Sequence, residues 1–340
     1  MAPYTGADLR RFLDGGVPGH LDLLRARKGG FAGGMFAISV SSPRPPEDPM
    51  NPTLRITHDG YEVRLADPVD PDHALRQTMD QLSALIRLEA LSNGRIRIVR
   101  SAADLETAIP EGILAMVLHS EGADAIDEDL RALDVLHAAG VRSLGPVWSR
   151  PNAFGHSVPF RFPVSPDTGP GLTEAGKALI RRCNDLGILI DVSHLNEKGF
   201  WDVARISEAP VVATHSSAWA ICPSTRNLTD DQLTAIRDSD GLVGVNFEVS
   251  ANRPDGYDEA DTSIGVLVAM IDYLVERIGI NRVGFGSDFD GATMPTAISD
   301  VTGLPVLIDA LRQRGYDEPA IEKLAWRNWL RVLRATWHDS

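Results

Sequence analysis

The chain has 340 residues, of which 43% are hydrophobic, and its 33 basic and 47 acidic residues give a net charge of −14. This length exceeds that of the usual single domain but suits one large α/β barrel with insertions, so we expect one domain over residues 1–340. The acidic charge and the lack of any basic block argue against nucleic acid and membrane surfaces as partners, and leave small molecules or peptides.

The first expected strand is short, at residues 18–23, and carries a histidine and an aspartate two residues apart. Side chains with this spacing share one face of a strand, so His20 and Asp22 would point the same way. On its own a His-x-Asp pair is weak evidence for a metal site, because a turn residue followed by a helix cap has the same pattern.

A strand, an insertion and a helix come next. Residues 34–40 (GMFAISV) predict the second strand. The polar, proline-rich residues 41–71 are typical of a loop over the mouth of the fold, with room for a small hairpin. Residues 70–92 have the apolar periodicity of a helix in an outer ring.

The third strand, at residues 113–118, leads into the segment HSEGAD. Glu121 therefore lies just past the carboxyl end of the strand, where a barrel carries its active site. His119 comes two residues earlier, and we expect it to support a ligand rather than to be one.

A helix at 128–139 separates this strand from the fourth strand at 141–147, which ends in Trp148. The proline-rich residues 149–171 form a second expected wall of the site. A helix over 173–186 follows, bounded by a threonine and a glycine.

The middle of the chain contains two similar strand patterns, each ending in a hydroxyl residue and a histidine. Apolar runs at 188–192 and 210–213 flank an amphipathic helix at 197–207, which predicts a parallel βαβ unit. Parallel neighbours end at one edge of the sheet, so His194 and His215 can converge there. A lone histidine at a strand end is more often packed or solvated than a ligand, but two convergent imidazoles suggest a metal ion.

Two helix–strand pairs complete the alternation, a helix at 229–239 with a strand at 242–247, and a helix at 263–278 with a strand at 282–287. The last strand delivers Asp288 and Asp290 in the sequence DFDG. Eight strands alternating with helices predict an α/β fold, a TIM-type (β/α)8 barrel with loop insertions over its carboxyl-terminal rim. A doubly wound open sheet is the alternative, but it normally has a glycine-rich phosphate turn after its first strand, and GHLDLL is not one.

The unusual polar residues all fall at the carboxyl ends of expected strands: His20, Asp22, Glu121, His194, His215 and Asp288. Three imidazoles and two carboxylates exceed the three protein ligands that hold one catalytic zinc ion. A carboxylate shared between two ions would give each ion about three ligands, so the count favours a two-metal site.

Several separated segments resemble, in the right order, the membrane dipeptidase (renal dipeptidase) family of zinc metallopeptidases, M19: GHLDL, HSEGAD, DVSHL, THSSA with the downstream Arg226 and Asn227, GSDFDG and, more weakly, NWLRVL. The resemblance spans most of the chain, and it implies two Zn²⁺ ions per chain and a homodimer. It implies the following ligands: His20 and Asp22 on one zinc ion, His194 and His215 on the second, and Glu121 bridging both. By the same resemblance, Arg226 binds the substrate carboxylate and Asp288 handles protons.

The sequence departs from the family pattern at the end of the fourth strand. Better-known members have a histidine there that is thought to contact the substrate carbonyl or the tetrahedral intermediate, whereas this chain has Trp148. Indole can donate one hydrogen bond but cannot act as an acid or base, so we expect Trp148 to bind substrate without proton transfer. His156, eight residues on, is a substitute for the missing imidazole or an ordinary loop histidine.

We therefore expect a zinc-dependent dipeptidase in which a hydroxide bridging two zinc ions attacks the peptide bond of a free dipeptide. Asp288 would orient or deprotonate the water and carry its proton to the leaving amine. Arg226 offers a planar fork to a carboxylate one residue past the scissile bond, which restricts the enzyme to dipeptides. The alternative role for Arg226 is a surface salt bridge.

Two other functions stay open at this point. An amidohydrolase acting on N-acyl amino acids or cyclic amides would often bridge its metals with a carboxylated lysine, and no expected strand ends in lysine. A non-catalytic metal-binding barrel would show an eroded ligand set, whereas this set is complete. Two cysteines are too few for a disulfide framework, the N-terminus lacks an apolar signal core and no apolar run is long enough for a membrane span, so we expect a cytoplasmic protein.

Overall fold

The computed structural model describes residues 6–42 and 54–338. Parallel strands run through its centre, and neighbouring strands follow one another in chain order. The first group contains β1 (Gly33–Ser39), β5 (Leu114–Glu121), β6 (Val141–Gly145) and β8 (Leu189–Ile190), with the short β4 (Ile96–Ile98) also paired with β5. The second group contains β9 (Val212–Ser216), β10 (Leu242–Asn246) and β11 (Val283–Gly286). The groups meet where the Val192 backbone N–H donates to the carbonyl of Val212 (2.9 Å), so the parallel order continues from β8 to β9.

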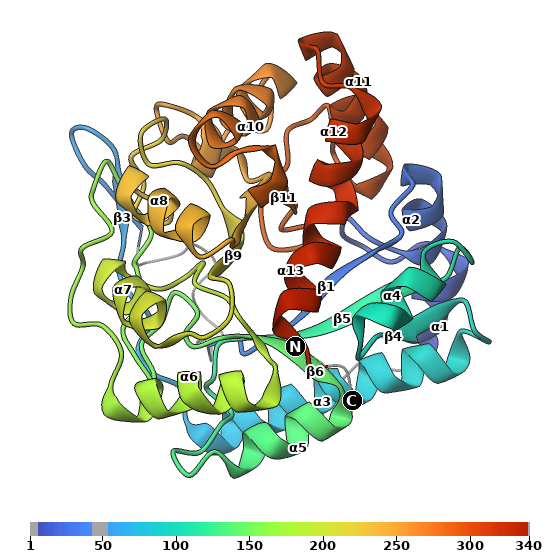
Figure 1. Cartoon of the computed structure of the whole chain (residues 1–340), viewed down its shortest axis with the longest axis horizontal. Coiled ribbons are helices and arrows are strands. Elements are labelled where there is room, and N and C mark those ends of the chain that lie inside the picture. Colours follow the sequence, from blue (N-terminus) through green and yellow to red (C-terminus); the bar gives the residue numbers. More distant parts are fainter. Residues whose placement is uncertain (1–5, 43–53, 339–340) are drawn as a thin grey trace.

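Helices cover the outside of these strands (Figure 1). They are α1 (Gly6–Asp14), α2 (Leu23–Gly29), α3 (Pro71–Leu91), α4 (Ala102–Ala108), α5 (Arg131–Ala139), α6 (Glu174–Leu186), α7 (Glu197–Ile206), α8 (Asp230–Asp238), α9 (Val249–Asn252), α10 (Ile264–Ile278), α11 (Leu304–Arg314), α12 (Glu318–Glu322) and α13 (Asn328–Thr336). Short turns of 3₁₀ helix lie at Ile280–Arg282 and Val301–Gly303, and a π-helical turn at Lys323–Arg327. The expected helices are confirmed as α3, α5, α6, α7, α8 and α10.

Every expected strand but the first is present, and the α/β fold with a parallel sheet is confirmed. The expectation of a strand at residues 18–23 is wrong. Gly19 has a φ of +99°, and the backbone then turns into α2, whose N-cap is Asp22. The Asp22 carboxylate accepts a hydrogen bond from the backbone N–H of Arg25 in the first helical turn. This capping bond favours the start of a helix over the continuation of a strand.

The turn that contains His20 contacts the segment that follows β11. The His20 backbone N–H donates to the Asp290 carboxylate just past β11, and its carbonyl accepts from the backbone of Val301 at 3.1 Å. In residues 6–42 and 54–338, however, no strand joins β11 to β1.

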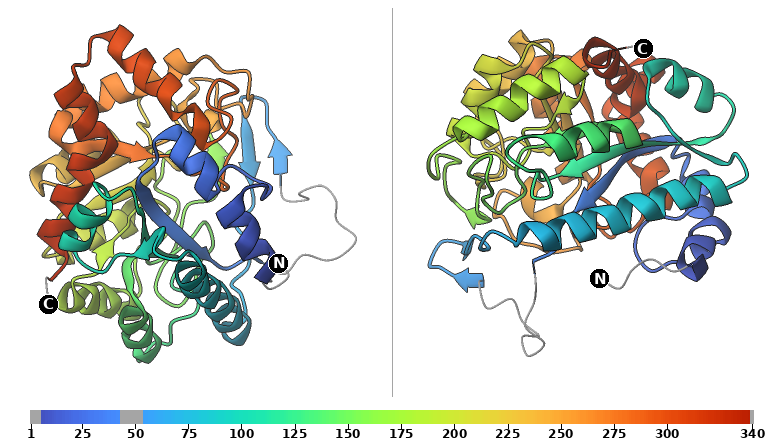
Figure 2. Two further views of the ribbon diagram at one scale, coloured as in Figure 1. Left: turned by 90° about the vertical axis from the view of Figure 1, so that its right-hand side faces the viewer. Right: turned by 90° about the horizontal axis from the view of Figure 1, so that it is seen from below.

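The two proline-rich insertions form one small antiparallel sheet. β2 (Leu54–Ile56) and β3 (Tyr61–Val63) make the expected hairpin, and β3 pairs with β7 (Arg161–Phe162) of the second insertion. Figure 2 shows the hairpin at the edge of the molecule. Residues 43–53 of the first insertion lie outside the described residues.

This sheet is tied to the segment that carries Arg226. The Arg161 backbone donates to Thr225 Oγ1 at 3.1 Å, and the Val164 backbone donates to the carbonyl of Pro223 at 2.8 Å. Both insertions are therefore joined, through this sheet, to the segment between β9 and α8.

The strands that carry the expected ligands are deeply buried. Every residue of β8 and β9 is buried, as is every residue of β5 except Glu121. Side chains packed on both faces fix these strands, so a ligand at the end of one has a well-defined position.

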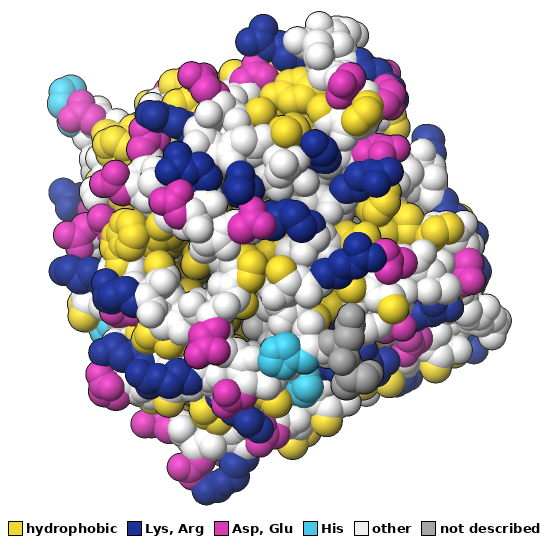
Figure 3. All heavy atoms as spheres, viewed as in Figure 1, with side chains coloured by type: hydrophobic (Ala, Val, Ile, Leu, Met, Phe, Trp, Pro, Cys, Tyr) yellow, Lys and Arg dark blue, Asp and Glu magenta, His cyan; other side chains and the backbone are white. Residues whose placement is uncertain are grey.

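The surface carries charges of both signs. On the face shown in Figure 3, basic and acidic side chains are interspersed rather than gathered by sign. Among the described helices, none has the length and apolar character needed to cross a membrane.

Candidate metal centre

Three expected ligands lie together at the carboxyl ends of β5, β8 and β9. Glu121 ends β5, His194 follows β8, and His215 lies near the end of β9. His194 Nε2 is 3.1 Å from Glu121 Oε1 and 3.1 Å from His215 Nε2, and His215 Nε2 is 3.4 Å from Glu121 Oε1. In the described part of the chain, no other group of three or more histidine, cysteine or acidic ligand atoms is this close together.

The spacing of these atoms fits a zinc ion. Tetrahedral zinc holds nitrogen and carboxylate oxygen at about 2.0–2.2 Å, which puts neighbouring ligand atoms roughly 3.3–3.6 Å apart. The observed separations of 3.1, 3.1 and 3.4 Å are close to this value. Two imidazoles and a carboxylate are also a donor set that zinc accepts. The three residues can therefore hold a metal ion without large movement.

The charges in the cluster also suit a cation. Burial opposes ionisation of Glu121, but hydrogen bonds and charges of the two histidines outweigh it and hold its pKa well below the usual range. Burial, together with the charge of Arg226, lowers the pKa of His194 to about 3, so this imidazole is neutral at pH 7. Burial disfavours the charged form of His215 as well, but Asp288 and Glu121 raise its pKa overall.

Arg226 lies beside the cluster rather than on the surface. Its side chain is buried, and its guanidinium donates to the backbone carbonyls of Ser193 and, at 3.4 Å, His215. Burial lowers its pKa. No carboxylate among the described residues lies within salt-bridge distance of this guanidinium, so the expected alternative of a surface salt bridge is wrong.

Trp148 packs directly against one of the cluster histidines. Its ring lies 5.9 Å from that of His194, at an interplanar angle of 40°. Phe160 meets the indole edge-on at 6.1 Å, and the buried Arg150 places its guanidinium carbon 5.6 Å from the indole centroid. The indole therefore forms part of the wall beside the cluster. The imidazole of His156 forms no hydrogen bond with the residues that the structure describes.

Asp288 stands next to the cluster without joining it. It has a φ of +58° in the turn after β11, and its Oδ2 accepts a hydrogen bond from Asn246 Nδ2 at 3.0 Å. Its charge is the largest influence that raises the pKa of His215. Asp288 is thus held near the cluster by a side chain from the end of β10.

The structure does not bring His20 and Asp22 into the cluster. His20 Nδ1 accepts a backbone hydrogen bond from Asp290 at 2.9 Å. Asp22 is buried, and its carboxylate accepts from the backbone (2.9 Å) and the Nε (2.8 Å) of Arg25. His119 is also outside the cluster, as expected, with its Nδ1 2.9 Å from Ser143 Oγ.

Sequence reasoning missed three polar residues near the site. Asp191 is buried behind the two histidines, Asn246 holds Asp288, and the half-buried Glu248 interacts electrostatically with Asp288 and Arg226. Burial and the charge of Asp288 raise the pKa of Glu248. All three lie at the carboxyl end of an expected strand, and the rule that selected Glu121 would have found them.

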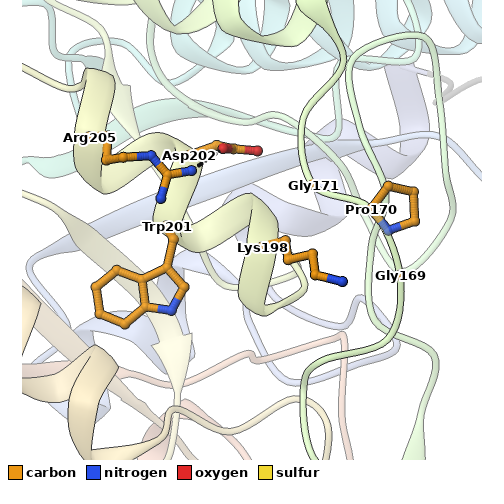
Figure 4. A pocket seen from close by; sticks show the side chains of 7 residues that line it. All are labelled: Gly169, Pro170, Gly171, Lys198, Trp201, Asp202 and Arg205. Atoms are coloured by element: carbon orange, nitrogen blue, oxygen red, sulfur yellow. Dashed lines mark hydrogen bonds and ion pairs between the residues drawn. The ribbon is translucent and has the colours of Figure 1, made fainter.

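A separate surface depression shares no residue with the cluster. It has a volume of about 700 Å³ and lies between α7 and the loop of the second insertion (Figure 4). Its lining residues are Gly169, Pro170, Gly171, Lys198, Trp201, Asp202 and Arg205. Figure 4 shows the Arg205 and Asp202 side chains paired with each other. The depression therefore offers no ligand set comparable to that of the cluster.

Comparison with known proteins links the whole chain to one family. Residues 5–338 match the family model described as membrane dipeptidase (peptidase family M19). A crystal structure of a Rhodobacter sphaeroides metallo peptidase, liganded with a phosphinate mimic of the dipeptide L-Ala-D-Ala, is 49% identical, covers 97% of this chain and 93% of its own, and has a TM-score of 0.92. The structure of the dipeptidase AC, a metallo peptidase of family M19, is 48% identical with the same coverage and a TM-score of 0.91.

A curated relative gives a further match. A Klebsiella pneumoniae protein described as an uncharacterized protein in the pqqA 5′ region is 53% identical over 272 residues, which is 80% of this chain and 99% of that protein.

Proposed function

The chain belongs to the membrane dipeptidase family, peptidase family M19, and from this premise we propose that it hydrolyses free dipeptides with two zinc ions per chain. Membership makes the protein a metallo-dipeptidase. The observation that carries the proposal in the structure is the trio of Glu121, His194 and His215, with ligand atoms 3.1–3.4 Å apart beside a buried arginine.

We propose that this trio holds one zinc ion and that Glu121 also reaches a second. His20 and Asp22 are the proposed ligands of that second ion, on the strength of the family resemblance and of the place of His20 beside the end of β11. Zinc bound to these residues would lower the pKa of a water molecule toward neutrality and polarise the scissile carbonyl.

The chain's own residues would position the substrate and move the protons. Asp288 is a half-buried carboxylate held by Asn246, so it can accept the proton of an attacking water and return it to the leaving amine. The indole ring of Trp148 lies beside His194, and its N–H can donate to a substrate oxygen but cannot exchange a proton.

Arg226 would select the free carboxylate of the substrate. Its guanidinium is buried, has no carboxylate within salt-bridge distance among residues 6–42 and 54–338, and ends next to the ligand histidines, 3.4 Å from His194 Nε2. A substrate carboxylate that neutralises this charge must lie close to the scissile bond, which is the case in a dipeptide and not in a longer peptide.

A metal analysis combined with a substrate panel tests the proposal. We expect two zinc equivalents per chain and hydrolysis of L-Ala-L-Ala, with L-Ala-D-Ala included because a mimic of it is bound in the Rhodobacter sphaeroides protein. A dipeptide amide should lose about 2–4 kcal/mol of transition-state binding, because it lacks the carboxylate that pairs with Arg226. Equal turnover of the amide and the free dipeptide would refute the role of Arg226.

The proposal extends to the first strand of the barrel, the domain organisation, the cellular location and the oligomeric state. We propose that residues 18–23 occupy the position of the first strand in a closed eight-stranded barrel, because they contact the end of β11. One domain over residues 1–340 agrees with a family match to residues 5–338. A cytoplasmic location agrees with two buried cysteines that are both free thiols. A homodimer rests on the resemblance alone.

A further inference from the structure

The two cluster histidines share an arrangement that the proposed mechanism does not use. Each follows a hydroxyl residue, Ser193 before His194 and Thr214 before His215. Both hydroxyls donate to one carboxylate: Ser193 Oγ lies 2.6 Å from Asp191 Oδ1, and Thr214 Oγ1 lies 2.6 Å from Asp191 Oδ2. The backbone N–H groups of the same two residues also donate to Asp191 Oδ1, at 3.0 and 2.8 Å.

Asp191 reaches His215 through both hydroxyls. Thr214 Oγ1 lies 2.8 Å from His215 Nδ1, and Ser193 Oγ accepts the backbone N–H of His215 at 3.1 Å. One carboxylate thus controls both the ring and the backbone of a single ligand. Direct contact is not involved, because Asp191 Oδ2 is 4.0 Å from His215 Nδ1.

Counting protons along this chain of hydrogen bonds fixes the tautomer of His215. A threonine hydroxyl has one proton, and Thr214 gives it to the Asp191 carboxylate. Toward His215 the same oxygen can only accept, so Nδ1 must carry a proton. Whenever the ring is neutral, as it must be to bind a metal ion, it presents a bare lone pair at Nε2, the nitrogen that faces Glu121 and His194.

The buried position of Asp191 makes this control strict. The residue is 3% exposed and has no lysine or arginine within salt-bridge distance among the described residues. Two hydroxyls and two backbone N–H groups donate to its carboxylate, so Asp191 is the acceptor in all four hydrogen bonds. If the Thr214 hydroxyl turned away, the buried Asp191 carboxylate would lose a donor, which costs free energy. This cost keeps the Thr214 hydroxyl pointing at Asp191.

We propose that Asp191 is a positioning residue of the metal centre, acting through the hydroxyls of Thr214 and Ser193 to set the tautomer and direction of His215 before the metal arrives. The inference rests on the proposed function in one respect, namely that His215 is a zinc ligand. Groups that orient a metal-binding histidine in this way typically change metal affinity by about 10- to 100-fold when removed.

The test measures zinc affinity by competition with a chromophoric chelator, in the full-length chain. Thr214→Val removes the hydroxyl at nearly constant shape, and Thr214→Ser keeps it. The zinc ion of interest is the one that is lost in His215→Ala. We expect the valine variant to bind this ion about 10- to 100-fold more weakly than wild type, and the serine variant to bind it within a few-fold of wild type. Ser217→Ala is the matched control, because Ser217 is a buried hydroxyl near the same strand end that bonds Asn252 Oδ1 at 3.1 Å and touches no cluster histidine.

Asp191→Asn should weaken the same ion to a similar degree, and adding Thr214→Val to it should cost little more, since both changes break one chain of hydrogen bonds. If Asp191→Asn does not fold, the Thr214 pair carries the test alone. NMR of the zinc-free protein with ¹⁵N-labelled histidine gives a second readout, in which wild-type His215 has its proton on Nδ1 and the valine variant shows a mixture of tautomers.

The outcomes separate this inference from the proposed function. Thr214→Val binding zinc within about three-fold of wild type, or losing no more than Ser217→Ala does, overturns the role of Asp191. An unchanged His215 tautomer in Thr214→Val has the same consequence. If instead His215→Ala keeps full zinc content, the proposed ligand set fails, whatever Asp191 does.

Discussion

The two sides of the candidate centre are built differently. On the strand side, Glu121, His194 and His215 lie at the ends of buried parallel strands, with ligand atoms 3.1–3.4 Å apart. On the turn side, His20 and Asp22 lie in a turn and a helix cap, and they bond with neighbours instead of with the cluster.

The difference shows what positions a ligand in each case. Strand register and packing fix the strand side, and the hydroxyls next to its histidines add directional hydrogen bonds. Hydrogen bonds within the chain determine the turn side: Arg25 donates to the Asp22 carboxylate, and the backbone of Asp290, which has a φ of +68°, donates to His20. A metal ion on the turn side would have to replace the hydrogen bonds that His20 and Asp22 make with the rest of the chain. A metal ion on the strand side would replace the contacts between ligand atoms and the 3.4 Å contact of Arg226 with His194 Nε2.

The largest effect is expected on the strand side, at Glu121. Glu121→Gln removes the charge from the residue proposed to bridge both ions, and metal catalysis contributes several kcal/mol, so kcat/KM should fall about 10⁴-fold or more. Elemental analysis should show loss at both sites. Glu111→Gln, which removes an exposed carboxylate, is the control and should match wild type. Full zinc content in Glu121→Gln would mean that this carboxylate is not a bridge.

The next largest effect is expected at Asp288, beside the cluster. Asparagine keeps the size of the side chain and can still hydrogen-bond with Asn246, but it cannot take up a proton. We expect kcat to fall by about 10²–10⁴ while both zinc ions and the melting temperature are retained. Zinc lost in step with activity would make Asp288 a ligand, and near-normal kcat would move proton transfer to another residue, with Asp290 the next candidate.

Arg226 should give an intermediate effect. Arg226→Lys keeps a positive charge but loses the planar fork, so kcat/KM for a dipeptide should fall by about 10- to 100-fold. With the dipeptide amide, which offers no carboxylate, the same substitution should matter much less. A loss of equal size on both substrates would show that Arg226 supports the cluster, through its bonds to the Ser193 and His215 carbonyls, rather than the substrate.

The fold was predictable wherever apolar runs are long and regular. β10 is buried throughout and β5 is buried up to Glu121, and the helices between the strands have clear apolar faces. Residues 18–23 misled the prediction because Leu21 and Leu23 supply strand-like alternation, while Asp22 is the N-cap of a helix that begins one residue later. The spacing of apolar residues is the same for both possibilities and does not distinguish them. β4 was missed because three residues give no pattern.

The site was predictable to the extent that strand ends converge. Glu121, His194 and His215 were found because parallel strands deliver their last residues to one edge. The role of Asp191 could not be derived from periodicity, since it depends on which proton each hydroxyl donates. The directions of the His20 and Asp22 side chains could not be predicted from the sequence either, because a turn takes its direction from contacts with distant segments such as the one after β11.

The smallest expected effect concerns Asp22, the residue for which helix cap and metal ligand compete. Asparagine can still accept the capping hydrogen bond from the Arg25 backbone, but it cannot form the ion pair or bind zinc as an anion. In the zinc-free protein we expect Asp22→Asn to lower the free energy of unfolding by about 1 kcal/mol or less, and Asp22→Ala, which removes the cap, by about 0.5–2 kcal/mol. Chemical denaturation measures both.

Acid and zinc then separate the two roles of Asp22. Burial disfavours the charge of Asp22, but the bonds from Arg25 hold its pKa below the ordinary value. The ionised group therefore stabilises the fold above about pH 3.9, and this contribution is lost as the pH falls through the folded-state pKa. Asp22→Asn should flatten that acid slope whether or not zinc binds there. Zinc stabilises only a fold that binds it. If Asp22 is a ligand, the difference in free energy of unfolding between wild type and Asp22→Asn therefore grows when zinc is added. Thr173→Ala, which removes the N-cap of α6, should show the same deficit with and without zinc. If the loss of unfolding free energy in Asp22→Asn is also the same with and without zinc, Asp22 is a helix cap and not a ligand. The turn side would then need another carboxylate to hold a second ion.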